Sequence, residues 1–174
     1  MGFKNAIFYL AILSIAGFFF GRILPKTWFQ WDAFPYRAFA FEREGRIYDQ
    51  VKIKLWQNKV PDMSRILPGT MPKKELPKNP TPEHVKGMLQ ETCVAEFIHW
   101  LHGFCGLYAM KLWPGVGGTL LSILYLIVGN VPFIMIQRYN RPRLRRIYIH
   151  LLGRQNSVKR KSEEFPYART HSVL

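Results

Sequence analysis

The chain is organised around Glu91-Thr-Cys-Val-Ala-Glu-Phe-Ile-His-Trp100, which opens its second long apolar run. Within this stretch Glu96 and His99 stand three residues apart, so on a helix they share one face. An acid and a histidine inside an apolar span are costly unless they pair with other groups or take part in chemistry. This pair is therefore the first candidate for a functional site.

The composition leaves two broad classes of protein. The 174 residues carry a formal net charge of +14, and 48% of them are hydrophobic, which fits a nucleic-acid-binding protein or a small membrane protein with basic cytoplasmic segments. Lys and Arg are nearly absent from three apolar runs and dense between and after them. A nucleic-acid-binding module interleaves them over its faces, so the pattern favours a membrane protein and argues against nucleic acid as a partner.

Three apolar runs predict three transmembrane helices, at about residues 5–22, 92–110 and 115–136, because their lengths suit a bilayer crossing. The first run could instead be a signal peptide, but it lacks a small-x-small cleavage site and ends in Phe18-Phe19-Phe20. The short connection Lys111-Leu-Trp-Pro114 joins the second and third runs into an antiparallel hairpin.

The segment 26–90 is expected to form a cytoplasmic amphipathic layer. It begins with aromatic residues suited to the lipid headgroup zone, continues with a helix predicted from Gly45 to Trp56, and then has a proline-rich connector from Pro61 to Pro82. The apolar side of the predicted helix consists of Ile47, Val51, Leu55 and Trp56. At the end of the connector, Thr81-Pro82-Glu83 predicts the start of a new helix with Thr81 as its N-terminal cap.

The segment 137–174 is basic again. Pro142 predicts a helix boundary beside Arg141, and residues 147–152 predict a basic interfacial helix that breaks near Gly153. The tail beyond Asn156 is expected to be solvated and loosely ordered.

The distribution of basic residues predicts the orientation. Of the 25 Lys and Arg residues, 13 lie within residues 22–86 and ten within residues 138–169, so both regions are expected in the cytoplasm with the N-terminus outside. The sequence thus predicts a single-domain, all-α, multi-pass integral protein of the cell membrane, in which a membrane hairpin and an N-terminal span carry cytoplasmic amphipathic basic helices.

Depth along the hairpin brings polar residues together. At 1.5 Å per residue, His99 lies about 10 Å inside its span and Asn130 about 12 Å inside the next, so antiparallel packing gives them similar depth. Glu96 lies nearer the interface, level with Gln137 and Arg138. We expect these five residues to line one pocket in the inner leaflet.

Three interpretations of this pocket remain open. In a catalytic site, Glu96 orients His99, His99 acts as general base towards a hydroxyl, and Asn130 holds an oxyanion. In a structural cluster, the same polar groups only hold the hairpin together. A metal site of Glu96, His99 and His102 has the least support, because these residues fan over about 120° of the helix without a second ligand-bearing motif.

A second polar cluster, Gln137-Arg-Tyr-Asn-Arg-Pro-Arg143, follows the third apolar run. Positive-inside anchoring accounts for Arg145 and Arg146, whereas Arg138 and Arg141 are placed to bind an anion such as the phosphate of an acyl donor. The candidate substrate-binding residues are Gln137, Arg138, Tyr139, Asn140, Arg141 and Arg143.

These motifs resemble those of the glycosyl-4,4'-diaponeurosporenoate acyltransferase family of staphyloxanthin-type carotenoid synthesis. The resemblance covers roughly residues 34–152 and rests on Glu91-Thr92, Ala95-Glu96-x-Ile98-His99-Trp100, Asn130-Val131-Pro132, Gln137-Arg-Tyr-Asn-Arg-Pro-Arg-Leu144, Phe41-Glu42-x-x-Gly45 and Lys54-x-Trp56-x-x-Lys59-x-Pro61.

The resemblance implies a membrane acyltransferase that esterifies a sugar hydroxyl of a glycosylated, carotenoid-type lipid with a fatty acyl chain. Its partners would be membrane lipid, a lipid-linked sugar acceptor and a fatty acyl donor such as acyl-CoA, which is a co-substrate, with no cofactor. The residues alone also leave open a non-catalytic membrane subunit that assembles a lipid-synthesis complex or presents lipid to it.

Overall fold

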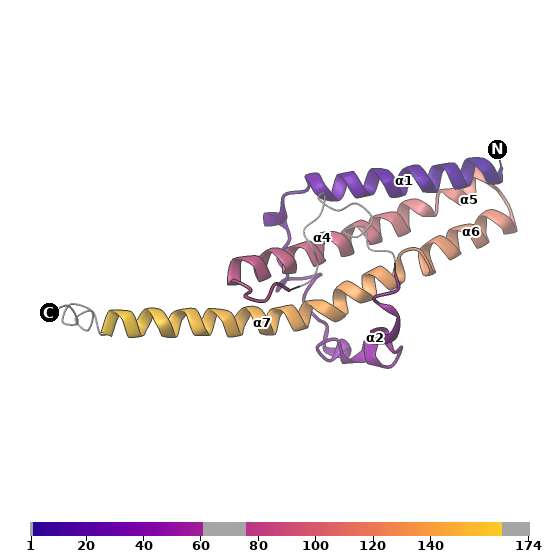
Figure 1. The fold of residues 1–174 in the computed structure, drawn as a ribbon. Coiled ribbons are helices and arrows are strands. Elements are labelled where there is room, and N and C mark those ends of the chain that lie inside the picture. Colours follow the sequence, from indigo (N-terminus) through magenta and orange to yellow (C-terminus); the bar gives the residue numbers. More distant parts are fainter. Residues whose placement is uncertain (1, 61–75, 165–174) are drawn as a thin grey trace.

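The described part of the chain, residues 2–60 and 76–164 of a computed structural model, is all helical and contains no strand. Three long passes make up the bundle in Figure 1, and they are α1 (Phe3–Ile23), α4 (Pro82–Gly106), and α6 (Val116–Ile127) continued by α7 (Val131–Glu164). The short elements are η1 (Lys26–Trp28), η2 (Ala40–Glu42), η3 (Arg46–Asp49), α2 (Ile53–Trp56) and α5 (Ala109–Leu112).

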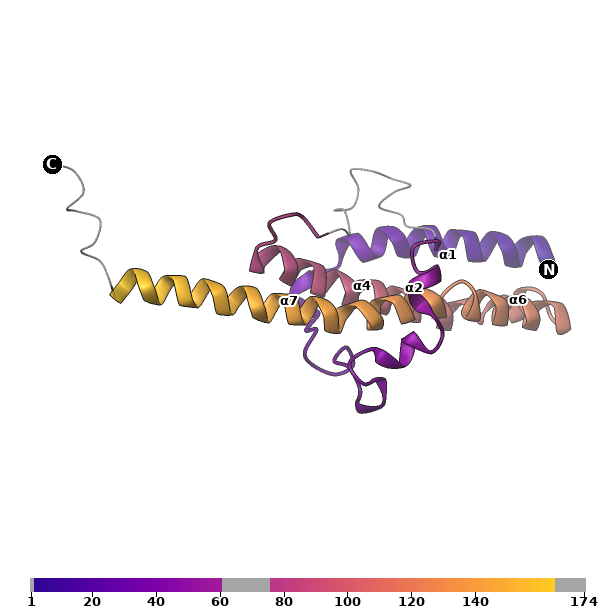
Figure 2. The same cartoon turned by 60° about the horizontal axis from the view of Figure 1, so that its bottom comes forward.

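Helix α4 is central, since it packs most extensively against α7 and also contacts α1 and α6. It runs antiparallel to α1 and to the α6–α7 pass, as the hairpin prediction requires (Figure 1). The N-terminus lies at the end of the bundle where α5 joins α4 to α6, and α7 extends far beyond the opposite end in both views (Figures 1 and 2).

Two helical segments of the described residues, Phe3–Ile23 and Val116–Lys161, are long and apolar enough to cross a membrane. Their outer faces are apolar, because Phe8, Ile15 and Leu124 are 68%, 60% and 57% exposed, and soluble monomers rarely expose such large apolar surfaces. The run 92–110 is not among these segments, so a third transmembrane span stays a prediction.

The start of α4 follows the predicted pattern. The Thr81 side chain accepts a hydrogen bond from the backbone N–H of His84 at 3.2 Å, Pro82 takes the first helical position, and Glu83 lies in the first turn. A cap of this kind contributes about 1 kcal/mol. The following turns are fixed by packing, because Val85 and Leu89 are fully buried against Leu144 of α7.

The helix predicted from Gly45 to Trp56 is wrong as a single element. The chain forms η3 and α2 there, separated by Lys52, whose φ of +52° lies in the left-handed region. That conformation interrupts a helix and is unfavourable for a residue with a Cβ. Consequently the apolar face also differs, because Ile53 is fully buried while Val51 and Leu55 are exposed.

The predicted helix ends at Pro142 and Gly153 are also wrong, since α7 continues through both residues to Glu164. Pro142 has no N–H to give to the carbonyl of Arg138, which normally weakens a helix. Here the flanking Arg138 and Arg141 are both bonded to α4, and these contacts hold the turns on either side of the proline. The predicted loose tail is therefore helical up to Glu164, and its remainder, 165–174, lies outside the described residues.

The third predicted span, 115–136, is divided by a turn at residues 128–130. Helix α6 ends at Ile127, and α7 begins with Val131 and Pro132, a position near a helix start that suits proline. The proline-rich connector is only partly visible, because residues 61–75 lie outside the described part. The turn matters for function, since it carries Asn130.

Candidate functional site

The turn between α6 and α7 places Asn130 against α4. Its side-chain Nδ2 donates a hydrogen bond to the backbone oxygen of Tyr125 at 2.8 Å, and its Oδ1 lies 3.0 Å from Nδ1 of His99. Asn130 is only 1% exposed. The two residues that the depth argument placed at the same level are therefore in direct contact.

These two contacts determine the tautomer of neutral His99. The Asn130 group that faces the Tyr125 carbonyl must be the NH₂, because a carbonyl oxygen can only accept, so the amide oxygen faces His99. Neutral imidazole can bond this oxygen only by donating from Nδ1, which leaves the lone pair on Nε2. In this tautomer Nε2, and not Nδ1, is the basic nitrogen of the ring.

The ring of His99 is also held by its aromatic neighbours. It stacks on Phe133 with ring centroids 4.5 Å apart and an interplanar angle of 11°, and it meets His102 almost perpendicularly with centroids 6.0 Å apart. Phe133 lies in the first turn of α7 and Asn130 in the turn just before it, so this one region of the chain supplies both the stacking ring and the amide. His99 is thus fixed in position as well as in tautomer.

A buried network of two acids and two arginines lies one turn of α4 from His99. We call it the Glu–Arg network, and it consists of Glu42, Glu96, Arg138 and Arg141. Arg138 donates from Nε and Nη2 to the two oxygens of Glu42 at 2.6 and 2.7 Å, and from Nη1 to Glu96 at 2.7 Å. Arg141 donates from Nη2 to the other oxygen of Glu96 at 2.6 Å. The side chains of the three ion pairs are at most 9% exposed.

The donors of the arginines are largely used inside the protein. Arg138 completes its five N–H groups with the backbone oxygens of Pro35 (3.2 Å) and Arg37 (3.3 Å). Arg141 also bonds the hydroxyl and backbone oxygens of Thr92 and the backbone oxygen of Tyr36. Binding of a donor phosphate by these arginines stays a prediction, and for Arg138 it requires that one of these bonds exchange.

The roles expected from the sequence are distributed differently in space. Glu96 was expected to orient His99, whereas its two carboxylate oxygens bind Arg138 and Arg141, and it is Asn130 that bonds His99 Nδ1. Asn130 was expected to hold an oxyanion, but its NH₂ already bonds Tyr125.

The other predicted binding residues lie around the network. Gln137 is buried, and Asn140 is half-buried. Tyr139 and Arg143 pack together instead, with the guanidinium 3.4 Å from the centre of the tyrosine ring, and the Tyr139 hydroxyl donates to Asp49 at 3.4 Å. They therefore join α7 to the η3 segment.

Sequence reasoning assigned no role to Glu42, Thr92 and Tyr48. Glu42 is 1% exposed and accepts hydrogen bonds from Arg138, from the hydroxyl of Tyr48 and from the backbone N–H of Phe39. Its signal in the sequence is an acid inside a run of aromatic residues, in a chain with only 11 acids against 25 bases. Such an acid is expected to pair with a base, but its partner is not readable from local sequence.

The electrostatics of Glu42 predict an acid-sensitive fold. Burial alone would raise the pKa of this carboxyl, but the bonds from Arg138, Tyr48 and the Phe39 amide outweigh burial and hold the pKa below its usual value. Because the pKa of Glu42 is lower in the folded state, its carboxylate stabilises the fold at pH values above the unfolded-state pKa of about 4.3. This stabilisation is lost as the pH falls through the folded-state pKa.

We expect Glu42→Gln to lower the unfolding temperature at pH 7. Below about pH 4.5 the unfolding temperature of this variant should depend less on pH than that of the wild type. Thermal unfolding of the detergent-solubilised protein between pH 3 and pH 7 measures both effects. Glu44→Gln, at an exposed position in the same segment, is the control. An equal change in both variants would contradict this role for Glu42.

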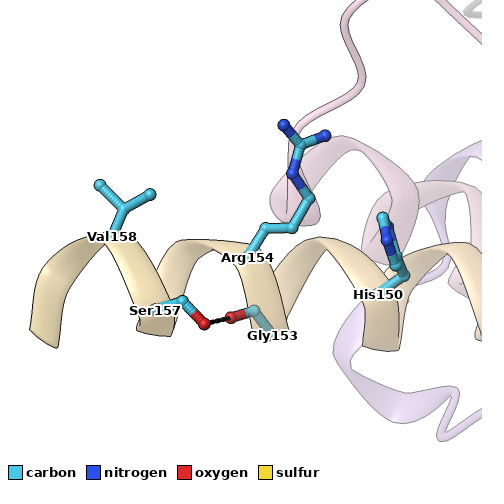
Figure 3. A pocket seen from close by; sticks show the side chains of 5 residues that line it. All are labelled: His150, Gly153, Arg154, Ser157 and Val158. Carbon is cyan, nitrogen blue, oxygen red and sulfur yellow. Dashed lines mark hydrogen bonds between the residues drawn. The ribbon is translucent and has the colours of Figure 1, made fainter. Parts of the chain in front are cut away.

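A hollow on α7 is not part of this site. It is lined by His150, Gly153, Arg154, Ser157 and Val158, all on successive turns of one helix (Figure 3). His150 is 20 residues from Asn130, about 30 Å along a helix. In the described residues, no group of three or more His, Cys, Asp and Glu side chains could hold a metal ion.

The structure thus defines an all-α protein with membrane-length helices and a histidine–amide pair at the centre of its bundle. A family model for glycosyl-4,4'-diaponeurosporenoate acyltransferase matches residues 25–150, so the chain belongs to this family and is an acyltransferase. The enzyme of that name from Staphylococcus aureus strain N315 is 30% identical over 128 residues, which cover 71% of this chain and 74% of that protein.

The homologue from Staphylococcus aureus strain USA300 carries the same name, is 29% identical over 125 residues, and has the same coverage. No solved structure matches the fold. The family match begins at Pro25, directly after α1, and ends at His150 within α7. The His99–Asn130 pair and the Glu–Arg network both lie inside the matched part.

Proposed function

We propose that the protein is a membrane-bound acyltransferase that esterifies a sugar hydroxyl of a glycosylated, carotenoid-type lipid with a fatty acyl chain. The observation that carries this proposal is the bond between His99 Nδ1 and Asn130 Oδ1, which prepares Nε2 as a base. The names of the Staphylococcus aureus relatives support the class of acceptor. No observation favours the alternative of a non-catalytic subunit.

In the proposed reaction, His99 Nε2 takes the proton of the sugar hydroxyl as its oxygen attacks the acyl carbonyl carbon. A new C–O ester bond forms, the bond to the donor's leaving group breaks, and the leaving group receives the proton from His99. Asn130 keeps the ring in position and stabilises the imidazolium through its amide oxygen. General base catalysis of this kind contributes about 10²–10⁴-fold to the rate.

The proposed setting is the cytoplasmic leaflet of the cell membrane. Helix α1, the 92–110 part of α4, and the α6–α7 pass would be the three spans, with the N-terminus outside. The two basic regions, with 13 and ten of the 25 Lys and Arg residues, would face the cytoplasm. Acyl-CoA, the proposed donor, and the lipid-borne acceptor would then meet near the headgroup plane.

The Glu–Arg network supports this chemistry by fixing α4 against α7. Glu96 and His99 lie one turn apart on α4, while Asn130 and Arg138 lie two turns apart on the α7 side. Because Glu96 shares α4 with His99 and the two arginines lie on α7, which follows Asn130, their pairing holds the two helices in the alignment at which His99 meets Asn130. Donor binding by the two arginines would be a second, weaker contribution.

The direct test is to produce the protein in a bacterial host that makes a glycosylated carotenoid acid but no acylated form of it. Lipid extraction and mass spectrometry are expected to show a new species, heavier than the glycoside by one fatty acid minus water. A host that makes an unrelated membrane protein is the control. If the protein accumulates in the membrane and the glycoside stays unmodified, the proposed acceptor class is wrong.

A further inference from the structure

Helix α1 lies outside the family-matched residues, yet its backbone makes a very close contact with α4. At Gly17 an added Cβ would lie 1.8 Å from Nε2 of His102 and 2.7 Å from its Cε1. No side chain larger than hydrogen fits there unless the imidazole moves. The contact is therefore specific for glycine on α1 and depends on the position of a histidine on α4.

His102 is a buried polar group that the proposed reaction does not use. It is only 7% exposed, and its ring interacts with the backbone of Leu13 in α1, although Nε2 makes no hydrogen bond of regular geometry within the described residues. A buried nitrogen without a well-formed hydrogen bond lowers stability, so packing alone does not explain a histidine here. Its ring meets the ring of His99 at 89° with centroids 6.0 Å apart, so one side of it faces Gly17 and another faces the proposed base.

A second series of contacts joins α1 to the same base. The hydroxyl of Ser14 donates to the Leu10 carbonyl at 2.9 Å, so it accepts from the hydroxyl of Tyr125 at 3.0 Å. The backbone oxygen of Tyr125 in turn fixes the Asn130 amide, which sets the tautomer of His99. Helix α1 thus reaches His99 through His102 and, independently, through Tyr125 and Asn130.

We propose that α1 is one wall of the catalytic centre and not only a membrane anchor, and that His102, held by the Gly17 backbone, is a positioning residue for His99. The inference rests on the proposed function of His99. An anchor needs only an apolar surface, which the exposed Phe8 and Ile15 provide. Gly17 is buried against α4, and Ser14, although exposed, bonds the hydroxyl of Tyr125 in α6; lipid anchoring requires neither contact.

The test compares Gly17→Ala with Gly21→Ala in the full-length, membrane-reconstituted protein. At Gly21 the added Cβ would lie 3.1 Å from Cγ1 of Ile98, a flexible apolar side chain that can adjust. We expect Gly17→Ala to lower kcat about 10²-fold, the effect of misplacing a catalytic group by about 1 Å, with little change in KM for the glycolipid. Gly21→Ala is expected to keep wild-type kcat.

A double variant separates positioning from general damage. If Gly17 only makes room for His102, Gly17→Ala combined with His102→Ala will be no slower than His102→Ala alone. Additive losses in the double variant, or equal kcat for Gly17→Ala and Gly21→Ala, would overturn the proposal. Thermal unfolding and the amount of protein in the membrane are measured for every variant.

Ser14 gives a test without added bulk, in case Gly17→Ala does not fold. We expect Ser14→Ala to lower kcat. Ser14→Thr, which keeps the hydroxyl, is expected to keep the wild-type kcat. Folded Ser14→Ala with wild-type kcat would contradict a role for α1 in catalysis. If the wild-type protein itself forms no ester, the proposed function fails, whereas an active wild type with insensitive α1 variants rejects this inference alone.

Discussion

His99→Ala is expected to lower the rate of ester formation by about 10²–10⁴-fold, the range that a general base contributes. The variant removes the nitrogen that accepts the hydroxyl proton, while Glu96, Arg138 and Arg141 still hold α4 to α7. The fold and membrane insertion should therefore survive. Steady-state kinetics of purified protein in lipid nanodiscs, with acyl-CoA and a glycosylated carotenoid, measure the effect.

His84→Ala is the matched control, because this histidine is exposed in the first turn of the same helix. It should keep the wild-type rate, since its cap bond uses its backbone N–H. A His99→Ala protein that turns over within about threefold of wild type would remove His99 from the chemistry, because that loss lies far below the contribution of a general base.

Arg138→Met is expected to have the largest effect on stability. It leaves Glu42 and Glu96 buried without the guanidinium that pairs with both, and breaking a buried ion pair from one side costs about 3–5 kcal/mol. We expect a matching fall in the free energy of unfolding, or failure of the variant to accumulate. Chemical unfolding of the detergent-solubilised protein, followed by tryptophan fluorescence, measures it.

Arg145→Met provides the comparison, because this arginine lies two turns further along α7 and its side chain is exposed. It should change the unfolding free energy by less than about 0.5 kcal/mol. Adding Glu42→Gln to Arg138→Met should recover part of the loss, since it removes the buried carboxylate that has lost its arginine, whereas Glu96 keeps its pair with Arg141. If the Glu–Arg network did not stabilise the fold, Arg138→Met would cost no more than Arg145→Met, and adding Glu42→Gln would recover nothing.

The sequence determined the features that depend on local pattern. The apolar run before Gly21 and the Thr81-Pro82-Glu83 start are local signals, and they correctly placed α1 and the beginning of α4. The contact between His99 and Asn130 could also be predicted, because His99 lies on a helix, Asn130 lies next to one, and helices have a fixed rise per residue. Counting along two antiparallel helices is then enough to bring two positions level.

Only the tertiary structure decided which groups the central polar residues bind. Glu42 reaches Arg138 across 96 positions of sequence, through an irregular segment whose path follows from backbone angles such as that of Lys52. Continuation of α7 through Pro142 likewise depends on ion pairs with another helix. The sequence marks Glu96, His99 and Asn130 as unusual because polar groups in an apolar run are costly. Their partners are fixed by long-range packing, which leaves no local pattern in the sequence.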